Sequence, residues 1–259
     1  MRFRALAGPG LASLATYVGI SLFNVYAVSL YLNGQLTLYI HPRYILFTVA
    51  LNAASLLACC VGFVVTSWRV ANGTITGGIA LRPSLALLVA GLVLAAAYAL
   101  PASTLSSSTA AQRADNLNGV QAPSPRTGDT LSAFGAGDAL AHTPRLAIED
   151  WVSAFGLEPD PDYYEGQEVD VVGFVFHPEG APRDVFYVSR FVVTCCAVDA
   201  RPIGLPVRSP GWQGRFEKDS WVRVTGRFVE AGGGVPEPVA VEPRSIEPAE
   251  QPQNPYVVG

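Results

Sequence analysis

The acidic residues of this chain are confined to its second part, and this asymmetry limits what the chain can fold into. All 21 Asp and Glu residues follow Arg113, whereas residues 1–112 contain no Asp, Glu or Lys. The first part is therefore apolar and weakly basic, and the second is polar and acidic. The net charge of −4 averages two unlike regions.

Three segments of the first part contain no ionisable residue and are long enough to cross a bilayer, which takes about twenty apolar residues. They are residues 11–32, 44–67 and 83–100. The first is too long for a cleaved signal peptide and is followed by more hydrophobic sequence. We therefore expect residues 1–102 to form an α-helical membrane region with three transmembrane helices.

The arginines predict how this region is oriented. Arg2, Arg4, Arg69 and Arg82 would share the cytoplasmic side if the N-terminus is inside, and only Arg43 would lie in an outside hairpin. Positive residues are enriched on the cytoplasmic side of membrane proteins. The pattern thus predicts a multi-pass protein of the plasma membrane with a cytoplasmic N-terminus, and three spans place the C-terminal part outside.

Polar residues in and beside the spans mark contacts with lipid or with a partner. Asn24 and Asn52 lie inside spans, where an amide needs a hydrogen-bond partner from another helix or subunit. His41 and Arg43 follow the first span, and we interpret them as a turn with an interfacial anchor, because one imidazole does not make a metal site. No span carries an ionisable residue, so this chain alone is a poor candidate for an ion-conducting path.

The remaining sequence predicts a linker over residues 103–142 and a mainly-β domain over residues 143–259. A helix should begin at Thr143-Pro144 and end at Gly156, before a run of short strands. The strands are expected at residues 168–177, 184–198, 203–207, 221–229 and 239–246, with a bulge at Gly226 and an extended tail from residue 247. Five short strands and one helix favour a Greek-key barrel of the OB type.

Adjacent cysteines occur twice, and one pair lies beside a carboxylate. Cys195 and Cys196 interrupt the second predicted strand, and Asp199 follows Cys196 by three residues. Three interpretations remain open: buried packing residues, an open metal site with Asp199 and also His177, or a vicinal disulfide or thiol relay. The other pair, in the second span, is interpreted as small residues at a helix contact.

The sequence also resembles a known family. RFVVTCCAVDARPIGLPV (190–207), DSWVRVTGRFVE (219–230), YIHPR (39–43), PASTLSSSTAA (101–111) and IEDW (148–151) are similar to segments of the YcgQ family, whose members are described as permease subunits. The resemblance covers most of the chain and implies a separate polytopic permease as partner, with a metal, zinc above all, as the related cargo. It also singles out Arg190, Thr194, Pro202 and Gly204 around the CCxxDA motif.

One departure from that family weakens a metal-collecting role for the loop between the second and third spans. Relatives are expected to carry a histidine-rich stretch there, but this chain reads WRVANGTITGGIALRP (68–83), without histidine.

These observations exclude several function classes. The chain has no phosphate loop, GxSxG, HExxH or Rossmann motif, which predicts that it is not an enzyme. Its acidic second part argues against nucleic-acid binding. We expect a membrane-anchored accessory subunit of a permease complex, linked to zinc transport or homeostasis. The alternatives are an extracytoplasmic binding or thiol-redox protein, and an envelope scaffold, each acting without a permease.

Overall fold

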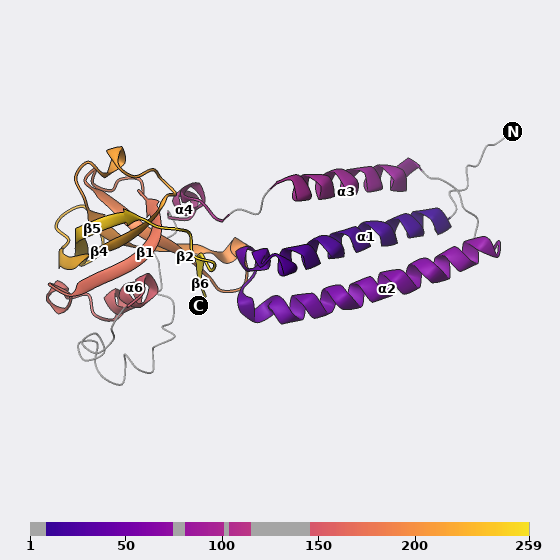
Figure 1. Cartoon of the computed structure of the whole chain (residues 1–259), viewed down its shortest axis with the longest axis horizontal. Helices are drawn as coiled ribbons and strands as arrows, with labels where there is room; N and C mark the ends of the chain where they lie inside the picture. The colour runs from indigo at the N-terminus through magenta and orange to yellow at the C-terminus, as the bar shows by residue number, and fades with distance from the viewer. Residues whose placement is uncertain (1–8, 75–80, 101–103, 115–145, 259) are drawn as a thin grey trace. The chain divides into compact units, whose positions relative to one another are not determined.

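The computed structural model describes residues 9–74, 81–100, 104–114 and 146–258 (Figure 1). These residues form two compact units, Met1–Ser103 and Thr104–Gly259. Each unit is described by itself below.

The described residues of the first unit are mainly helical. It contains α1 (Pro9–Leu32), the short 3₁₀ helices η1 (Gln35–Leu38) and η2 (Pro42–Tyr44), α2 (Ile45–Ala71) and α3 (Leu81–Ala99). The segments Ser13–Leu32 and Pro42–Ala71 are long and apolar enough to cross a membrane. α3 coincides with the third predicted span, but the described residues hold two such helices rather than three. Membrane-crossing character is therefore supported for two of the three predicted spans.

α1 and α2 pack closely around one polar contact. Asn24 is almost fully buried, and its amide donates to Ser55 Oγ on α2 (3.0 Å) and to the Ile20 carbonyl on its own helix (2.9 Å). A Cβ placed on Gly62 would lie 2.6 Å from the ring of Tyr17, so the Tyr17 side chain packs directly against the glycine. The predicted need of Asn24 for a partner is thus met within the chain.

The second unit is a closed β-barrel with short helices around it. Its strands are β1 (Glu168–Phe176), β2 (Val185–Val193), β3 (Arg201–Arg208), β4 (Trp221–Glu230), β5 (Val239–Pro248) and β6 (Tyr256–Val258). Neighbouring strands follow the order β1-β4-β5-β3-β2-β6, and an additional β1–β2 pairing closes the first five into a ring. The β3–β5 and β2–β6 pairings are parallel and the others antiparallel. This arrangement fits an OB-like fold.

The first five strands match the sequence prediction in existence and order, with one marked difference in length. β2 ends at Val193, although strand character was predicted through residue 198. The β4–β5 register shifts between Thr225 and Gly226, as predicted for a bulge. A Cβ on Gly226 would lie 2.2 Å from the Glu242 carbonyl oxygen, so the bulge requires glycine. The predicted extended tail contains a sixth strand, β6.

The helix before the barrel has a defined N-terminus. α6 spans Ile148–Leu157, and the Asp150 carboxylate accepts a hydrogen bond from the Ala147 N–H (2.9 Å) at its N-terminus. Asp150 therefore fixes the helix start, whereas the predicted start at Thr143-Pro144 lies outside the described residues. The helix ends one residue beyond Gly156, without the left-handed glycine cap that the sequence suggested.

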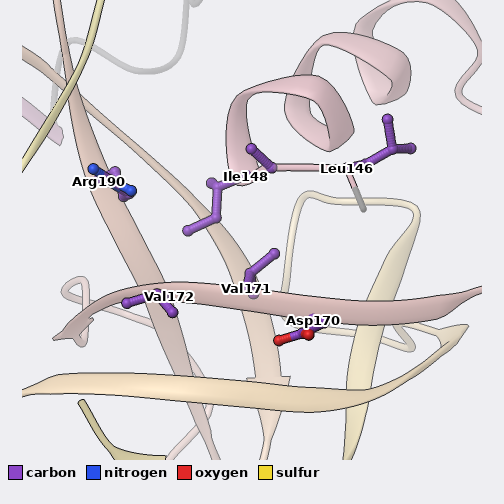
Figure 2. A pocket seen from close by; sticks show the side chains of 7 residues that line it. Leu146, Ile148, Asp170, Val171, Val172 and Arg190 are labelled. Atoms are coloured by element: carbon purple, nitrogen blue, oxygen red, sulfur yellow. The ribbon is translucent and has the colours of Figure 1, made fainter. Parts of the chain in front are cut away.

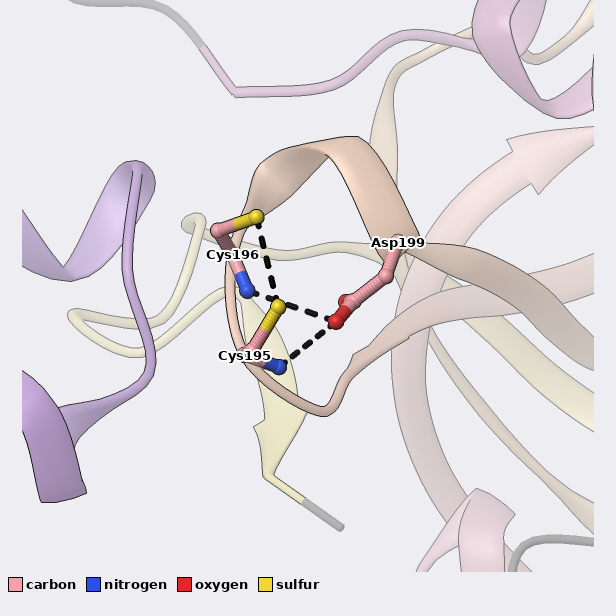
Figure 3. A group of neighbouring side chains, drawn as sticks. All are labelled: Cys195, Cys196 and Asp199. Carbon is pink, nitrogen blue, oxygen red and sulfur yellow. Dashed lines mark hydrogen bonds between the residues drawn. The ribbon is translucent and has the colours of Figure 1, made fainter.

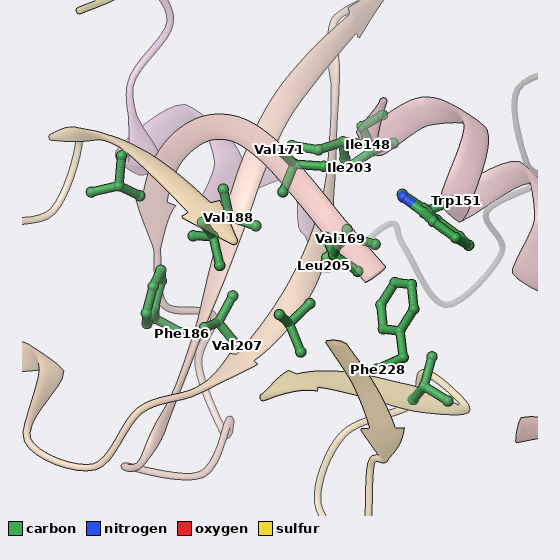
Figure 4. Close-up of a cluster of buried hydrophobic side chains, with 14 of the residues drawn as sticks. Ile148, Trp151, Val169, Val171, Phe186, Val188, Ile203, Leu205, Val207 and Phe228 are labelled. Atoms are coloured by element: carbon green, nitrogen blue, oxygen red, sulfur yellow. The ribbon is translucent and has the colours of Figure 1, made fainter. Parts of the chain in front are cut away.

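The barrel interior and the inner face of α6 form the larger of two hydrophobic clusters (Figure 4). Trp151 on α6 meets Phe228 on β4 edge-to-face, with ring centroids 4.8 Å apart. Tyr164 is fully buried, and its hydroxyl donates to the carbonyls of Ala154 (2.8 Å) and Glu158 (2.7 Å), which ties α6 to the start of the barrel. Ile148, Trp151 and Ala154 thus form the side of α6 that packs on the barrel.

The smaller cluster lies under α4 (Ser107–Ala114), which covers one side of the barrel. Ala110 is fully buried in this cluster together with Phe174 and Phe191, whose rings stack at 5.3 Å. The Asp219 carboxylate accepts from the Ser107 N–H and hydroxyl at the N-terminus of α4. Residues 104–114 thus belong to the β-domain and not to a linker, because these contacts hold them there. Residues 115–142 of the predicted linker lie outside the described residues.

Candidate functional site

The predicted thiol-bearing corner is the loop that joins β2 to β3, residues 194–200. Val192 pairs with Arg201 where the two strands meet, so the loop closes a hairpin. It contains one 3₁₀ turn, η5 (Ala197–Asp199). Pro202 lies opposite Phe191 at the start of β3, and a Cβ on Gly204 would lie 2.5 Å from Ser189 Oγ. Of the residues that the resemblance singles out, these two shape the hairpin below the loop.

Asp199 holds the loop together through its carboxylate. Oδ1 accepts a hydrogen bond from the Thr194 N–H (3.0 Å), and Oδ2 accepts from the N–H groups of Cys195 (2.7 Å) and Cys196 (3.4 Å). Burial tends to raise the pKa of Asp199, but the Cys195 side chain and these three N–H donors outweigh it and lower the pKa. The carboxylate is therefore ionised at neutral pH. It also explains why β2 stops at Val193, since these N–H groups point to Asp199.

The two thiols lie next to each other, close to the carboxylate of Asp199 (Figure 3). Cys195 Sγ lies 3.4 Å from Cys196 Sγ, and both cysteines are free thiols. The two sulfur atoms and a carboxylate oxygen of Asp199 all lie within 4.8 Å of one another. Cys195 is exposed, and Cys196 and Asp199 are partly exposed, so a solute can reach this group. The structure therefore unites three of the four residues predicted for this site.

The thiol of Cys195 is held in its protonated form. Hydrogen bonds to Asp199 and then to Cys196 raise the pKa of Cys195 from 9.0 to about 12. A thiol reacts as a nucleophile, and also binds a metal, through its thiolate, which is scarce at such a pKa until a bound cation displaces the proton. The loop is thus unlike the electropositive surroundings of reactive cysteines, whereas two sulfurs and a carboxylate are a donor set that a zinc-like cation uses.

Arg113 on α4 braces the loop from outside the hairpin. Its Nη1 donates to the carbonyl oxygens of Ala197 (3.1 Å) and Ala200 (2.6 Å), which flank Asp199 in the chain. Sequence reasoning did not select this residue. The available signal was its position two residues after the PASTLSSSTAA stretch, which agreed with the family that the chain resembles.

His177 is not brought to the thiols. β1 and β2 pair with Phe176 opposite Tyr187, which places His177 beside the start of β2, whereas Cys195 follows the end of that strand. The His177 Nδ1 lies 2.9 Å from the Val185 carbonyl oxygen, and its ring lies 5.4 Å from that of Trp212. These contacts assign His177 a packing role in this structure.

Arg190 fastens the C-terminal segment to the barrel. Its Nε donates to the Pro255 carbonyl (3.2 Å) and its Nη2 to the Asn254 carbonyl (2.5 Å), just before β6. The guanidinium carbon also lies 5.7 Å from the centre of the Trp221 ring. Burial lowers the pKa of Arg190. This motif residue therefore stabilises the fold by holding a segment that lies more than sixty residues further along the chain.

A small cavity of about 160 Å³ lies between α6 and the strands β1 and β2 (Figure 2). Its walls are mainly apolar, with Asp170 and Arg190 as the charged members. Asp170 is paired with Arg223 on β4 (2.6 Å), and Arg190 binds the carbonyls described above. Because both charged groups are engaged within the fold, this cavity is a weaker candidate than the thiol loop.

Asn52 and His41, two polar residues of the first unit, form hydrogen bonds with residues close to them in sequence. Asn52 is half-buried on α2 and donates to the Thr48 carbonyl of its own helix (2.8 Å). His41 caps η2, where its Nδ1 accepts from the Arg43 N–H (3.0 Å). The His41 ring is buried, and its Nε2 has no hydrogen-bond partner among the described residues.

Comparison with known proteins finds one family model that matches the C-terminal part of the chain. Residues 145–258 match the family model of the DUF1980 C-terminal domain, whose description assigns no activity. The match covers the barrel, α6 and the thiol loop but not α4. No curated protein and no solved structure matches the chain.

Proposed function

We propose that this protein is a membrane-anchored accessory subunit of a permease complex, and that its β-domain binds a metal cation, with zinc as the first choice. The observation that carries the proposal is the convergence of two thiols and one carboxylate within 4.8 Å in an accessible loop. Such a donor set suits a transition-metal cation better than an organic ligand.

The anchoring part of the proposal rests on the apolar helices. Two segments are long and apolar enough to cross a membrane, and their exposed apolar side chains suit contact with lipid. The arginine distribution favours a cytoplasmic N-terminus, with the β-domain outside the cytoplasm. A phosphatase that is active only outside the cytoplasm, fused after Gly259, tests this orientation; an inactive fusion together with a fluorescent cytoplasmic reporter would reverse it.

The partner in this proposal is a polytopic permease that provides the conducting path. The family resemblance motivates it, and the absence of ionisable residues from the predicted spans is consistent with it. Asn52, half-buried on α2, offers a polar group for contact with a partner helix. A permease should copurify with the tagged chain in mild detergent. If none copurifies in repeated preparations, the chain would act instead as a binding protein or scaffold without a permease.

A thiol-redox function is the second candidate because two free thiols lie 3.4 Å apart. One observation favours metal binding over it. Adjacent residues form a strained disulfide, whereas two sulfurs and a carboxylate oxygen within 4.8 Å of one another suit a cation without strain. A zinc-limitation phenotype that Cys195→Ser and Cys196→Ser each reproduce would support metal handling, whereas a phenotype that responds only to reductants would support redox chemistry.

A further inference from the structure

We propose that Cys195, Cys196 and Asp199 form an open site for one thiophilic cation with a filled d shell, Zn²⁺ being the model case. The two sulfurs are the principal ligands, a carboxylate oxygen is the third, and the fourth position remains available to an exchanging ligand. This inference rests on the proposed function and narrows its cargo to a class of cation and a mode of binding.

The spacing of the two sulfurs suits a shared metal ion. Zinc binds thiolate sulfur at about 2.3 Å, and a tetrahedral angle then sets two such sulfurs about 3.8 Å apart. The observed separation of Cys195 Sγ and Cys196 Sγ is 3.4 Å, so a shift of a few tenths of an ångström would accommodate the cation. Such a shift is small for side chains that are exposed or half-buried.

Asp199 has a double role that makes it a weaker ligand than the thiols. Both of its oxygens already accept backbone N–H groups, from Thr194, Cys195 and Cys196. These donors neutralise part of its charge while fixing its position. The site therefore depends on sulfur, which excludes Mg²⁺ and Ca²⁺, since these cations need about six oxygen ligands.

The site has three ligand groups and faces solvent. Among the described residues, no further His, Cys, Asp or Glu belongs to the group. Structural zinc sites are closed by four protein ligands, whereas sites that exchange a ligand keep a position open. An exposed three-ligand site is thus suited to receiving a cation and passing it on by ligand exchange.

Binding at this site is a simple exchange reaction. The two S–H protons pass to the buffer, two metal–sulfur bonds form, and water molecules leave the hydrated cation. No electron is transferred, so no oxidant or reductant is needed. Arg113 keeps the carbonyls of Ala197 and Ala200 in place, and the loop therefore does not have to be built by the metal.

The test uses the full chain in mild detergent under reducing conditions. A background variant carries Cys59→Ala and Cys60→Ala, so that Cys195 and Cys196 are the two thiols left in the chain. Zn²⁺ is titrated by equilibrium dialysis while free thiols are counted by alkylation. Cd²⁺ is the optical probe, because its thiolate complexes absorb in the ultraviolet. Mg²⁺ in large excess is the competitor.

We expect one equivalent of Zn²⁺ per chain, protection of both thiols, and no displacement by Mg²⁺. Cys195→Ser and Cys196→Ser should each weaken binding at least 100-fold, and Asp199→Asn about tenfold. The reciprocal control, Cys195→Ser with Cys196→Ser in a chain that keeps Cys59 and Cys60, should not bind. Circular dichroism and thermal unfolding verify that each variant is folded. If Asp199→Asn is unfolded, Cys196→Ser provides the test of the site in its place.

The inference is overturned if both thiols of the folded background variant are alkylated at the same rate with and without Zn²⁺. Stoichiometric binding that survives Cys195→Ser and Cys196→Ser would also overturn it. The zinc titration does not depend on the permease. If the chain binds zinc at this site but no permease copurifies with it, only the accessory-subunit proposal is refuted.

Discussion

The chain contains the same dipeptide, Cys-Cys, in two backbone settings that give it different properties. In α2, successive side chains are about 100° apart around the axis, and Cys59 is buried while Cys60 is exposed. In the β2–β3 loop, Cys195 and Cys196 place their sulfur atoms 3.4 Å apart. Adjacent thiols thus become a pair of donors only where the backbone departs from regular structure.

The second difference between the pairs is the carboxylate. Residues 1–112 contain no acidic residue, so Cys59 and Cys60 have none nearby in sequence. Asp199, by contrast, organises the N–H groups of the whole loop and raises the pKa of Cys195. Asp199 therefore determines the environment of the second pair as much as the cysteines do.

Removing Asp199 should produce the largest change and make Cys195 behave as an ordinary thiol. If the pKa of Cys195 returns from about 12 toward 9.0, its thiolate fraction near pH 8 rises by up to a thousandfold. A less basic thiolate is also a poorer nucleophile, with a Brønsted coefficient of about 0.4–0.5, which leaves a net acceleration of roughly 30-fold. We expect this acceleration in Asp199→Ala, measured by alkylation with a metal chelator present.

Cys60 is the control for this measurement, because it shares the chain but not the carboxylate. Its alkylation rate should be the same in wild type and Asp199→Ala. Equal alkylation rates for Cys195 in the two proteins would show that the carboxylate does not raise the pKa of this thiol. The two cysteine pairs would then differ only in the spacing of their sulfur atoms.

The second-largest effect should come from Arg113. Arg113→Ala removes hydrogen bonds from a charged donor to the carbonyls of Ala197 and Ala200, which we expect to cost about 1–3 kcal/mol of unfolding free energy. Zn²⁺ affinity should fall several-fold, with partial recovery in Arg113→Lys. Thermal unfolding and zinc titration provide the two measurements.

Arg201 is the matched control for Arg113, since it lies beside the same loop and is exposed. Arg201→Ala should leave unfolding free energy within about 0.5 kcal/mol. If the two variants lose the same stability, Arg113 acts through general charge, and the bracing contacts described above do not matter.

Much of the barrel could be predicted because its local patterns agree with its burial. WVRVTGRFVE alternates along β4 between buried and exposed residues, and Gly226 marked the bulge. β2 was predicted too long because VVTCCAV has the composition of a strand. Its local preference is overruled by Asp199, whose carboxylate draws the N–H groups of Thr194 to Cys196 away from a ladder.

The parts that the sequence did not predict depend on long-range contacts. α4 is short and polar, and only the burial of Ala110 against the barrel reveals it as part of the domain. β6 depends on Arg190, which is more than sixty residues away in sequence. At the site, the grouping of Asp199 with the two cysteines was predicted from their proximity in the sequence. His177 was one candidate for a further ligand, and the structure places it beside the opposite end of β2, because a sequence pattern does not show which strand ends lie together.

The pH dependence of stability should distinguish Asp199 from a second carboxylate, Glu237. The lowered pKa of Asp199 means that its contribution is present above about pH 4 and is lost as the pH falls further. Burial raises the pKa of Glu237, which accepts from the Tyr187 hydroxyl at 2.7 Å, so the folded state loses stability as the pH rises from about 4.5.

Unfolding free energy measured from pH 3 to pH 8 tests both signs. Asp199→Asn should lose stability relative to wild type mainly above pH 4, and Glu237→Gln should lose none, or gain, over the same range. Two variants with parallel profiles would contradict the opposite surroundings assigned to these carboxylates.

The smallest effects should come from the cysteines in α2. Cys60→Ser changes an exposed side chain and should alter unfolding free energy by no more than about 0.5 kcal/mol. Cys59→Ser places a hydroxyl at a buried position and should cost about 1 kcal/mol. Neither substitution should change the Zn²⁺ affinity measured by the same titration. A changed affinity in either variant would show that the cysteines of α2 take part in zinc binding.

The burial of α4 determines where a fragment of this protein can be cut. A fragment that starts at residue 145, where the family match begins, would lack Leu105 and Ala110 and would uncover Phe174 and Phe191. It would also lose Arg113 and so the brace of the thiol loop. Such a fragment should aggregate and bind zinc poorly, whereas one that starts at Thr104 should stay monomeric. The homology boundary and the folding boundary of this domain are about forty residues apart.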